Sequence, residues 1–160
     1  MEGFRQSIIL TLLILVVFLS MLFLMFLNIK GNNISFYEFP KANITVCYSI
    51  MNINNLSCMK EKVYLATTVQ EQSKGYMNAS NTILFGMLFI FNNESTQCFW
   101  MKNTKIPLEQ LWISNNGTVL YSYYAEPESN LSKCYIGRYV LETNPLPRDI
   151  KIAKVYYTNS

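Results

Sequence analysis

The sequence predicts a mainly β protein, a compact β-sandwich or small barrel with one short helix, preceded by one N-terminal transmembrane helix. Three observations support this fold class. A long apolar run lies near the N-terminus, short runs rich in Val, Ile, Tyr, Phe and Trp recur through the rest of the chain, and clusters of Asn, Gly, Pro and Ser separate them. About 130 residues follow the apolar run, enough for one domain with its own core.

The apolar run extends from Ile8 to Leu27 and is interrupted only by Thr11 and Ser20. At about 1.5 Å per residue, a helix of this length crosses a hydrocarbon core of about 30 Å. A cleaved secretory signal has a shorter apolar stretch followed by small residues, whereas this run is followed by the polar segment 28–31. We therefore expect a transmembrane helix at residues 8–29.

Seven Asn-X-Ser/Thr sequons follow this run and none precedes it. Chance predicts about two to three in a chain of this composition, although a chain rich in Asn and Ser also generates sequons passively. The excess indicates N-linked glycans and a domain outside the cell. The sequons begin at Asn33, Asn43, Asn55, Asn78, Asn93, Asn116 and Asn130.

These features divide the chain into four parts and predict a single-pass protein of the cell membrane. We expect a cytoplasmic N-terminus at 1–7, the transmembrane helix at 8–29, a linker at 30–42 and an extracytoplasmic β-rich domain at 43–160. The part beyond residue 30 carries 11 Lys and Arg against 9 Asp and Glu, without a basic stripe. Nucleic acid is therefore not an expected partner.

The four cysteines also lie beyond the apolar run, and none forms a C-x-x-C motif. Disulfides in an oxidising compartment are expected rather than a zinc site, with buried free thiols as the alternative. We favour a bond between Cys47 and Cys58, which flank a short polar loop. That choice leaves Cys98 to pair with Cys134.

The domain contains one clear hairpin and one helix signal. In the hairpin, Asn115-Asn116-Gly117 is expected to supply residues with positive φ between two strands. The helix is expected at 69–76, where Thr68 and Glu71 form a capping box and Gly75 ends the helix. The expected strands span 44–50, 62–67, 84–91, 97–101, 110–114, 118–124, 138–143 and 150–157.

Four segments carry a family resemblance: VYLATTVQEQSKGYM (63–77), GMLFIF (86–91), FWMKNTKIPLEQLWISNNGTV (99–119) and RYVLE (138–142). In order and spacing they resemble the prokaryotic family called domain of unknown function 192. The resemblance implies a compact β-rich fold with one short helix, often exported or membrane-anchored, and no established activity. Two positions depart from the family pattern: Glu109 replaces an Asp, and the segment 143–147 replaces a glycine-containing turn.

The signature segments also contain the candidate site residues. Asn103 and Thr104 follow a strand, where such side chains stabilise turns or contact a ligand. Lys102 is expected to pair with Glu109 or Glu142, or to bind an anionic group in a cleft. Trp100 is expected to pack in the core, so that its replacement by Ala is the most damaging change in this stretch.

We interpret the protein as a binding or accessory module that contacts a partner protein in a cell-envelope or membrane complex, with no cofactor. One alternative is a small enzyme that uses Glu109, Glu142 and Lys102; the chain has no histidine, which excludes imidazole-based catalysis. A second alternative is a Cu(I)-handling domain that uses cysteine thiols with Met77, Met87 and Met101, although core packing also explains these methionines.

Overall fold

The structure is a computed structural model, and it describes residues 15–16, 18–21, 39–51, 55–81 and 84–158. The chain divides into two units, Met1–Ile34 and Ser35–Ser160. The transmembrane helix expected at 8–29 lies mostly outside the described residues; within it, 15–16 and 18–21 are helical. No helix in the described part of the chain is both long enough and apolar enough to cross a membrane.

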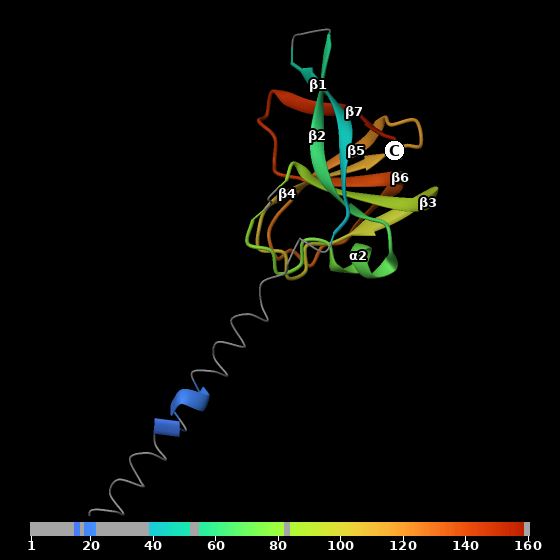
Figure 1. Ribbon diagram of the computed structural model, residues 1–160. Coiled ribbons are helices and arrows are strands. Elements are labelled where there is room, and N and C mark those ends of the chain that lie inside the picture. Colours follow the sequence, from blue (N-terminus) through green and yellow to red (C-terminus); the bar gives the residue numbers. More distant parts are fainter. Residues whose placement is uncertain (1–14, 17, 22–38, 52–54, 82–83, 159–160) are drawn as a thin grey trace, which may run out of the picture. The chain divides into compact units, whose positions relative to one another are not determined.

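The second unit is built on one mainly antiparallel sheet of seven strands in the order β5-β4-β6-β3-β2-β1-β7 (Figure 1). Every neighbouring pair is antiparallel except β2 and β3, which are parallel and connected through α2. The elements are β1 (Lys41–Ile50), β2 (Leu56–Ala66), α2 (Val69–Lys74), β3 (Gly86–Phe99), β4 (Leu108–Ile113), β5 (Val119–Ala125), β6 (Lys133–Thr143) and β7 (Ile150–Tyr157).

The sheet curls until its two terminal strands nearly meet, so the fold is a nearly closed barrel rather than a sandwich. An isolated antiparallel bridge joins Thr118, just before β5, to Lys154 in β7. Next to it, the backbone N–H of Val155 donates to the carbonyl of Gly117 at 2.8 Å. Gly117 has a φ of +84°, and a Cβ there would lie 2.5 Å from the Val155 carbonyl, so this contact requires glycine.

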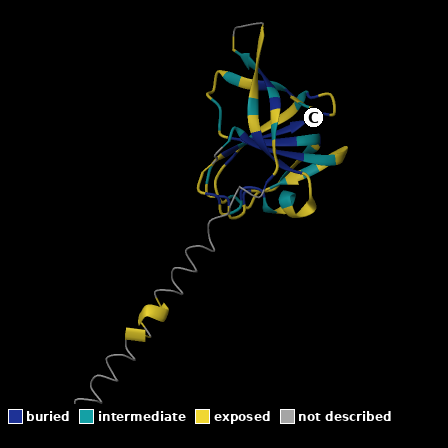
Figure 2. Cartoon of the chain, viewed as in Figure 1, coloured by how far each residue is buried: buried dark blue, intermediate teal, exposed yellow. Residues whose placement is uncertain are grey.

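Apolar side chains form a core on each face of the sheet, because residues along a strand alternate between its faces. The inner core fills the barrel and includes Ile44, Leu88, Leu111 and Ile152. The outer core lies on the opposite face and includes Phe89, Met101 and Trp112, with Tyr76 from the segment after α2. Figure 2 shows the buried residues concentrated on the strands of the sheet.

The structure confirms the expected capping box at α2. Thr68 is the N-cap, its hydroxyl accepts from the backbone N–H of Glu71, and the Glu71 carboxylate accepts from the N–H of Thr68. Gly75 occupies the C-cap with a φ of +43°. Helix α2 ends at Lys74, two residues before the predicted end, because the following turn brings Tyr76 into the outer core.

Both expected disulfides are present, Cys47 to Cys58 and Cys98 to Cys134. Each joins residues directly opposite one another in neighbouring antiparallel strands, β1 with β2 and β3 with β6. The hairpin between β4 and β5 is also present. Its turn uses positive φ only at Gly117, while the Asn116 side-chain oxygen accepts from the N–H of Thr118 at 3.1 Å.

The prediction of a separate strand at 97–101 is wrong. Residues 86–99 form the single strand β3, which continues through the polar run 92–96 that resembles a turn in the sequence. The pairing with β6 shifts between Ile90 and Ser95, and the side chains of 92–96 are exposed. Polar residues are tolerated there because these five side chains face solvent, and the strand returns to the outer core at Phe99. At the N-terminal side, β1 begins at Lys41, inside the expected linker.

Candidate functional site

A cleft of about 340 Å³ lies where the signature segments converge, and we call it the helix cleft. One wall is α2 with the Gly75-Tyr76-Met77 turn, and the other is β3 with the segment that follows it. Of the predicted site residues, Thr104 and Glu142 line it, together with Gln72, Phe89, Phe91 and Trp100. The sequence motifs therefore meet at one place although they are far apart along the chain.

Glu142 is a buried carboxyl group on the outer face of the sheet, with 4% of its surface exposed. It lies opposite Gln110 in the pairing of β4 with β6, and the Gln110 amide donates to its Oε1 at 2.9 Å. Burial raises the pKa of Glu142 to about 7, and the hydrogen bond from Gln110 offsets part of this rise. Glu142 also raises the pKa of the buried Tyr76 hydroxyl, although burial of Tyr76 is the larger cause.

The loop that carries Lys102, Asn103 and Thr104 is fixed by backbone hydrogen bonds to two other segments. Asn103 adopts a φ of +57°, and its carbonyl accepts from the N–H of Asn78 at 2.7 Å. Thr104 is buried, and its carbonyl accepts from the N–H of Glu128 at 2.9 Å. The Lys102 ammonium lies 5.1 Å from the Trp100 ring centre, a cation–π contact at the surface rather than an ion pair with either glutamate.

Of the two tryptophans, the structure buries Trp112 and exposes Trp100. Trp100 is 51% exposed, so the expectation that it packs in the core is wrong. Trp112 is fully buried, its indole N–H donates to the carbonyl of Gln97 at 2.9 Å, and its ring makes edge contacts with Phe99 and Tyr135. Strand β3 ends at Phe99, so the alternation that would have turned Trp100 toward a core is lost at that point.

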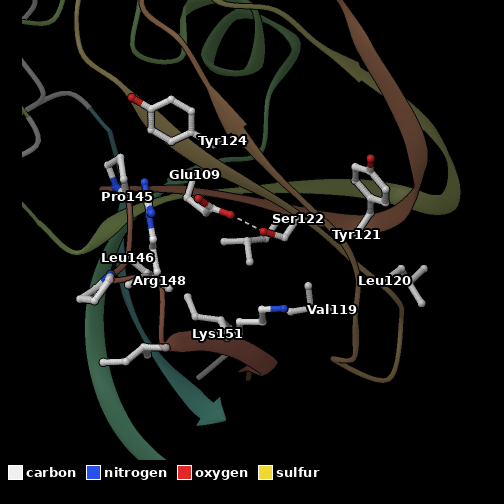
Figure 3. A pocket seen from close by; sticks show the side chains of 14 residues that line it. Glu109, Val119, Leu120, Tyr121, Ser122, Tyr124, Pro145, Leu146, Arg148 and Lys151 are labelled. Carbon is white, nitrogen blue, oxygen red and sulfur yellow. Dashed lines mark hydrogen bonds between the residues drawn. The ribbon is translucent and has the colours of Figure 1, made fainter. Parts of the chain in front are cut away.

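A larger cleft of about 720 Å³ lies between β5 and β7, and we call it the seam cleft (Figure 3). Val119 to Ser122 and Tyr124 form one wall, and the segment 145–152 forms most of the other. Glu109 is at this cleft, where its carboxylate accepts a hydrogen bond from the Ser122 hydroxyl. The two departures from the family pattern, Glu109 and the segment 143–147, therefore both contribute to this cleft.

The structure does not bring the predicted catalytic set together. Glu109 lies opposite Thr143 and Glu142 lies opposite Gln110, so the two carboxylates occupy opposite faces of the sheet. Lys102 contacts neither. Sequence reasoning also missed Gln110, which is the partner of Glu142, and Arg148 and Lys151, which line the seam cleft. A lone amide inside the buried strand LEQLWI is the signal that could have identified Gln110.

The proposed copper ligands are dispersed. Met87 and Met101 are packed in the outer core and Met77 lines the helix cleft, while all four cysteines are in disulfides. Within the described ranges, no group of three or more Cys, Asp or Glu side chains is placed to hold a metal ion.

Six of the seven sequon asparagines are described and all six are exposed: Asn43, Asn55, Asn78, Asn93, Asn116 and Asn130. Asn33 lies outside the described residues.

The fold, the two disulfides and the two clefts described above belong to a small β-barrel domain made from a single sheet. Comparison with known proteins identifies the family. The family model DUF192, described as "Uncharacterized ACR", matches residues 51–146, and the chain belongs to this family. The resemblance read from the signature segments is thus confirmed.

Two solved structures share the fold. One is a candidate transcription regulator from Sinorhizobium meliloti 1021, with a TM-score of 0.62 and 23% identity; the match covers 78% of this chain and 96% of that one. The other is a protein of unknown function from Novosphingobium aromaticivorans DSM 12444, with a TM-score of 0.59 and 24% identity, covering 73% and 85%. No curated protein matches the chain in sequence.

Proposed function

We propose that the protein is a membrane-anchored, glycosylated module that displays its β-barrel outside the cell and binds a partner protein there. Residues 8–29 are the anchor, and the partner belongs to a membrane or cell-envelope complex. The observation that carries the proposal is the pair of disulfides, of which Cys98–Cys134 is exposed at both residues. An exposed disulfide persists in an oxidising compartment and is reduced by thiols in the cytosol.

The exposed sequon asparagines support the same location. An oligosaccharide needs an accessible Asn, and six separate sequons provide one. Binding is favoured over catalysis because the two carboxylates of the enzyme hypothesis lie on opposite faces of the sheet. A single glutamate without imidazole or a second carboxylate offers few routes for acid–base chemistry.

The location is tested with the full chain, carrying a C-terminal epitope, in a host that performs N-glycosylation. Protease added to intact cells should remove the epitope, and N-glycosidase treatment of the membrane fraction should lower the apparent mass. A variant with Asn→Gln at all seven sequons is the matched control and should show no mass change with the glycosidase. An epitope that becomes accessible only after lysis would overturn the proposed location.

The binding role is tested separately by chemical cross-linking on intact cells, followed by purification in mild detergent. A partner should be cross-linked to the wild-type chain in a fixed ratio. Recovery of the chain alone, at several cross-linker concentrations, would overturn the binding role while leaving the location unaffected.

A further inference from the structure

The seam between β5 and β7 is an incomplete junction of the barrel. These strands end the sheet, so among the described strands β5 pairs only with β4 and β7 only with β1. They meet at the Thr118–Lys154 bridge and at the hydrogen bond between Val155 and Gly117. Beyond that point the edges separate, and the seam cleft occupies the space between them.

Both walls of this cleft are sheet edges. An edge strand presents N–H and C=O groups on its outer side that have no ladder partner, and these groups template the addition of another strand. Natural proteins usually protect long edges with lysine, proline or covering loops. Here Pro145, Pro147 and Lys151 lie on the β7 side, whereas the β5 wall contains Leu120, Tyr121 and Tyr124, which are all exposed.

The seam cleft is lined by apolar side chains and by three charged ones. Its apolar part comes from Leu111 and Ile152 of the inner core and from Leu146, which packs against that core. Two cations, Arg148 and Lys151, and one carboxylate, Glu109, also line it. Figure 3 shows Glu109 directed toward Ser122 on the β5 side, with Arg148 and Lys151 on the opposite segment.

We infer that the seam cleft is the docking site for a single extended peptide segment of a partner protein, with apolar side chains at every second position and at least one carboxylate. The segment pairs with the free edge of β5 and fills the space between β5 and β7. Its apolar side chains face Leu111 and Ile152, and its carboxylate lies near Arg148 and Lys151. The inference rests on the proposed binding function and specifies its site and partner.

The geometry favours a lone segment over the sheet edge of a folded partner. Pro145, Pro147 and Lys151 protect the β7 side of the cleft, so the segment pairs through its β5 side only, and a lone strand enters the space between the two walls more readily than a strand that is already part of a sheet. A second copy of this protein offers strands that are already paired on at least one side. Two cations, Arg148 and Lys151, line the cleft with one carboxylate, Glu109. The cleft therefore favours an acidic segment over a basic one.

The experiment uses the full chain in detergent micelles and a display library of random twelve-residue peptides. Enriched peptides are synthesised with a fluorescent label, and their affinity is measured by polarisation. We expect sequences with apolar residues at alternate positions and one or more Asp or Glu. Enrichment of no peptide above empty micelles, or enrichment of basic or helical sequences, would overturn the inference.

Backbone pairing is tested by methylating the peptide nitrogens one at a time. Strand addition uses alternate N–H groups on each side, so a methyl group should weaken binding by about tenfold where the N–H points to β5. Positions whose N–H points away should change less, which gives an alternating pattern along the peptide. Uniform loss, or no loss at any position, would exclude strand addition.

Paired variants locate the site. The double variant Arg148→Glu with Lys151→Glu should weaken the binding of the acidic peptides by about tenfold or more. The matched control is Lys105→Glu, which changes an exposed lysine outside the cleft. Circular dichroism of each variant establishes that the fold is retained. Equal effects of the two changes would overturn the inference, and so would a concentration-dependent dimer of the wild-type chain that the double variant abolishes. Surface display of the protein would stand in either case, because it is measured independently.

Discussion

Glu109 and Glu142 lie on neighbouring strands, one pairing step apart in register, yet their environments differ completely. Glu109 is at the seam cleft with a serine hydroxyl as its partner, and Glu142 is buried on the other face with an amide as its partner. The difference follows from alternation along the strands: Glu109 faces the side of Thr143, and Glu142 the side of Gln110. A shift of one position thus separates a partly solvated carboxylate from one whose ionisation opposes folding.

The largest effect is expected on the outer face that holds Glu142. Trp112→Ala should lower the free energy of unfolding by about 3 to 5 kcal/mol, because it empties a fully buried site and leaves the Gln97 carbonyl unpaired. Trp100→Ala, at an exposed position, should cost under about 1 kcal/mol. Urea unfolding of both variants measures the contrast, and equal losses would mean that the two tryptophans are not distinguished by burial.

Removal of the exposed disulfide should be nearly as damaging, although it leaves no cavity. Cys98 and Cys134 are 36 residues apart, so replacing both by Ser should cost about 4 kcal/mol through the greater freedom of the unfolded chain. The pair Cys47 and Cys58 closes only 11 residues and should cost about 3 kcal/mol. Calorimetry of the two double variants gives the order, and the reverse order would show that strain or local packing outweighs loop length.

Glu142→Gln should change the pH dependence of stability. The folded-state pKa, about 7, lies above the usual value of 4.5, so between these values the folded protein binds more protons than the unfolded chain. The contribution of Glu142 to the free energy of unfolding should therefore be most favourable below about pH 4.5. It should fall as the pH rises to about 7 and stay constant above that. The total loss is on the order of 3 kcal/mol.

The glutamine variant keeps a polar partner for Gln110 but carries no charge. We expect it to lack this pH dependence and to unfold at a higher temperature than the wild type at pH 8. Melting curves at pH 4.5, 6 and 8 measure both effects. A variant less stable than the wild type at pH 8 would indicate that the Glu142 carboxylate is stabilised by an ion pair, as the sequence alone suggests with Lys102.

The smallest effect is expected at the seam. Glu109→Gln and Ser122→Ala should each change the free energy of unfolding by under about 1 kcal/mol, because their hydrogen bond is exposed. The same melting series measures both variants beside Glu142→Gln. A large loss of stability at either position would mean that the seam is as important for stability as the buried site of Glu142.

The features that local chemistry determines were predicted correctly from the sequence. The Thr68–Glu71 capping box depends on residues three apart, and most strands are marked by β-branched and aromatic runs. The disulfide between Cys47 and Cys58 follows from a hairpin with a short loop. The second disulfide followed because only two cysteines remained.

The features that depend on long-range register were not predictable in this way. The partner of Glu142 is on β4, 32 residues earlier, and only the pairing of β4 with β6 selects Gln110 over a nearby cation. The choice between sandwich and barrel depends on whether β5 approaches β7, a contact made by Gly117 and Val155. Trp100 was misassigned because the end of β3 at Phe99 has no clear signal in the sequence.

The pairing of β1 with β7 imposes an order on the maturation of the protein. The hairpin of β1 and β2 forms from adjacent residues and carries its own disulfide, so it can assemble while later segments are still being synthesised. The other side of β1 stays uncovered until Ile150–Tyr157 emerges. During that interval the nascent domain presents an open edge that can pair with other chains, so aggregation is most favoured before β7 is in place.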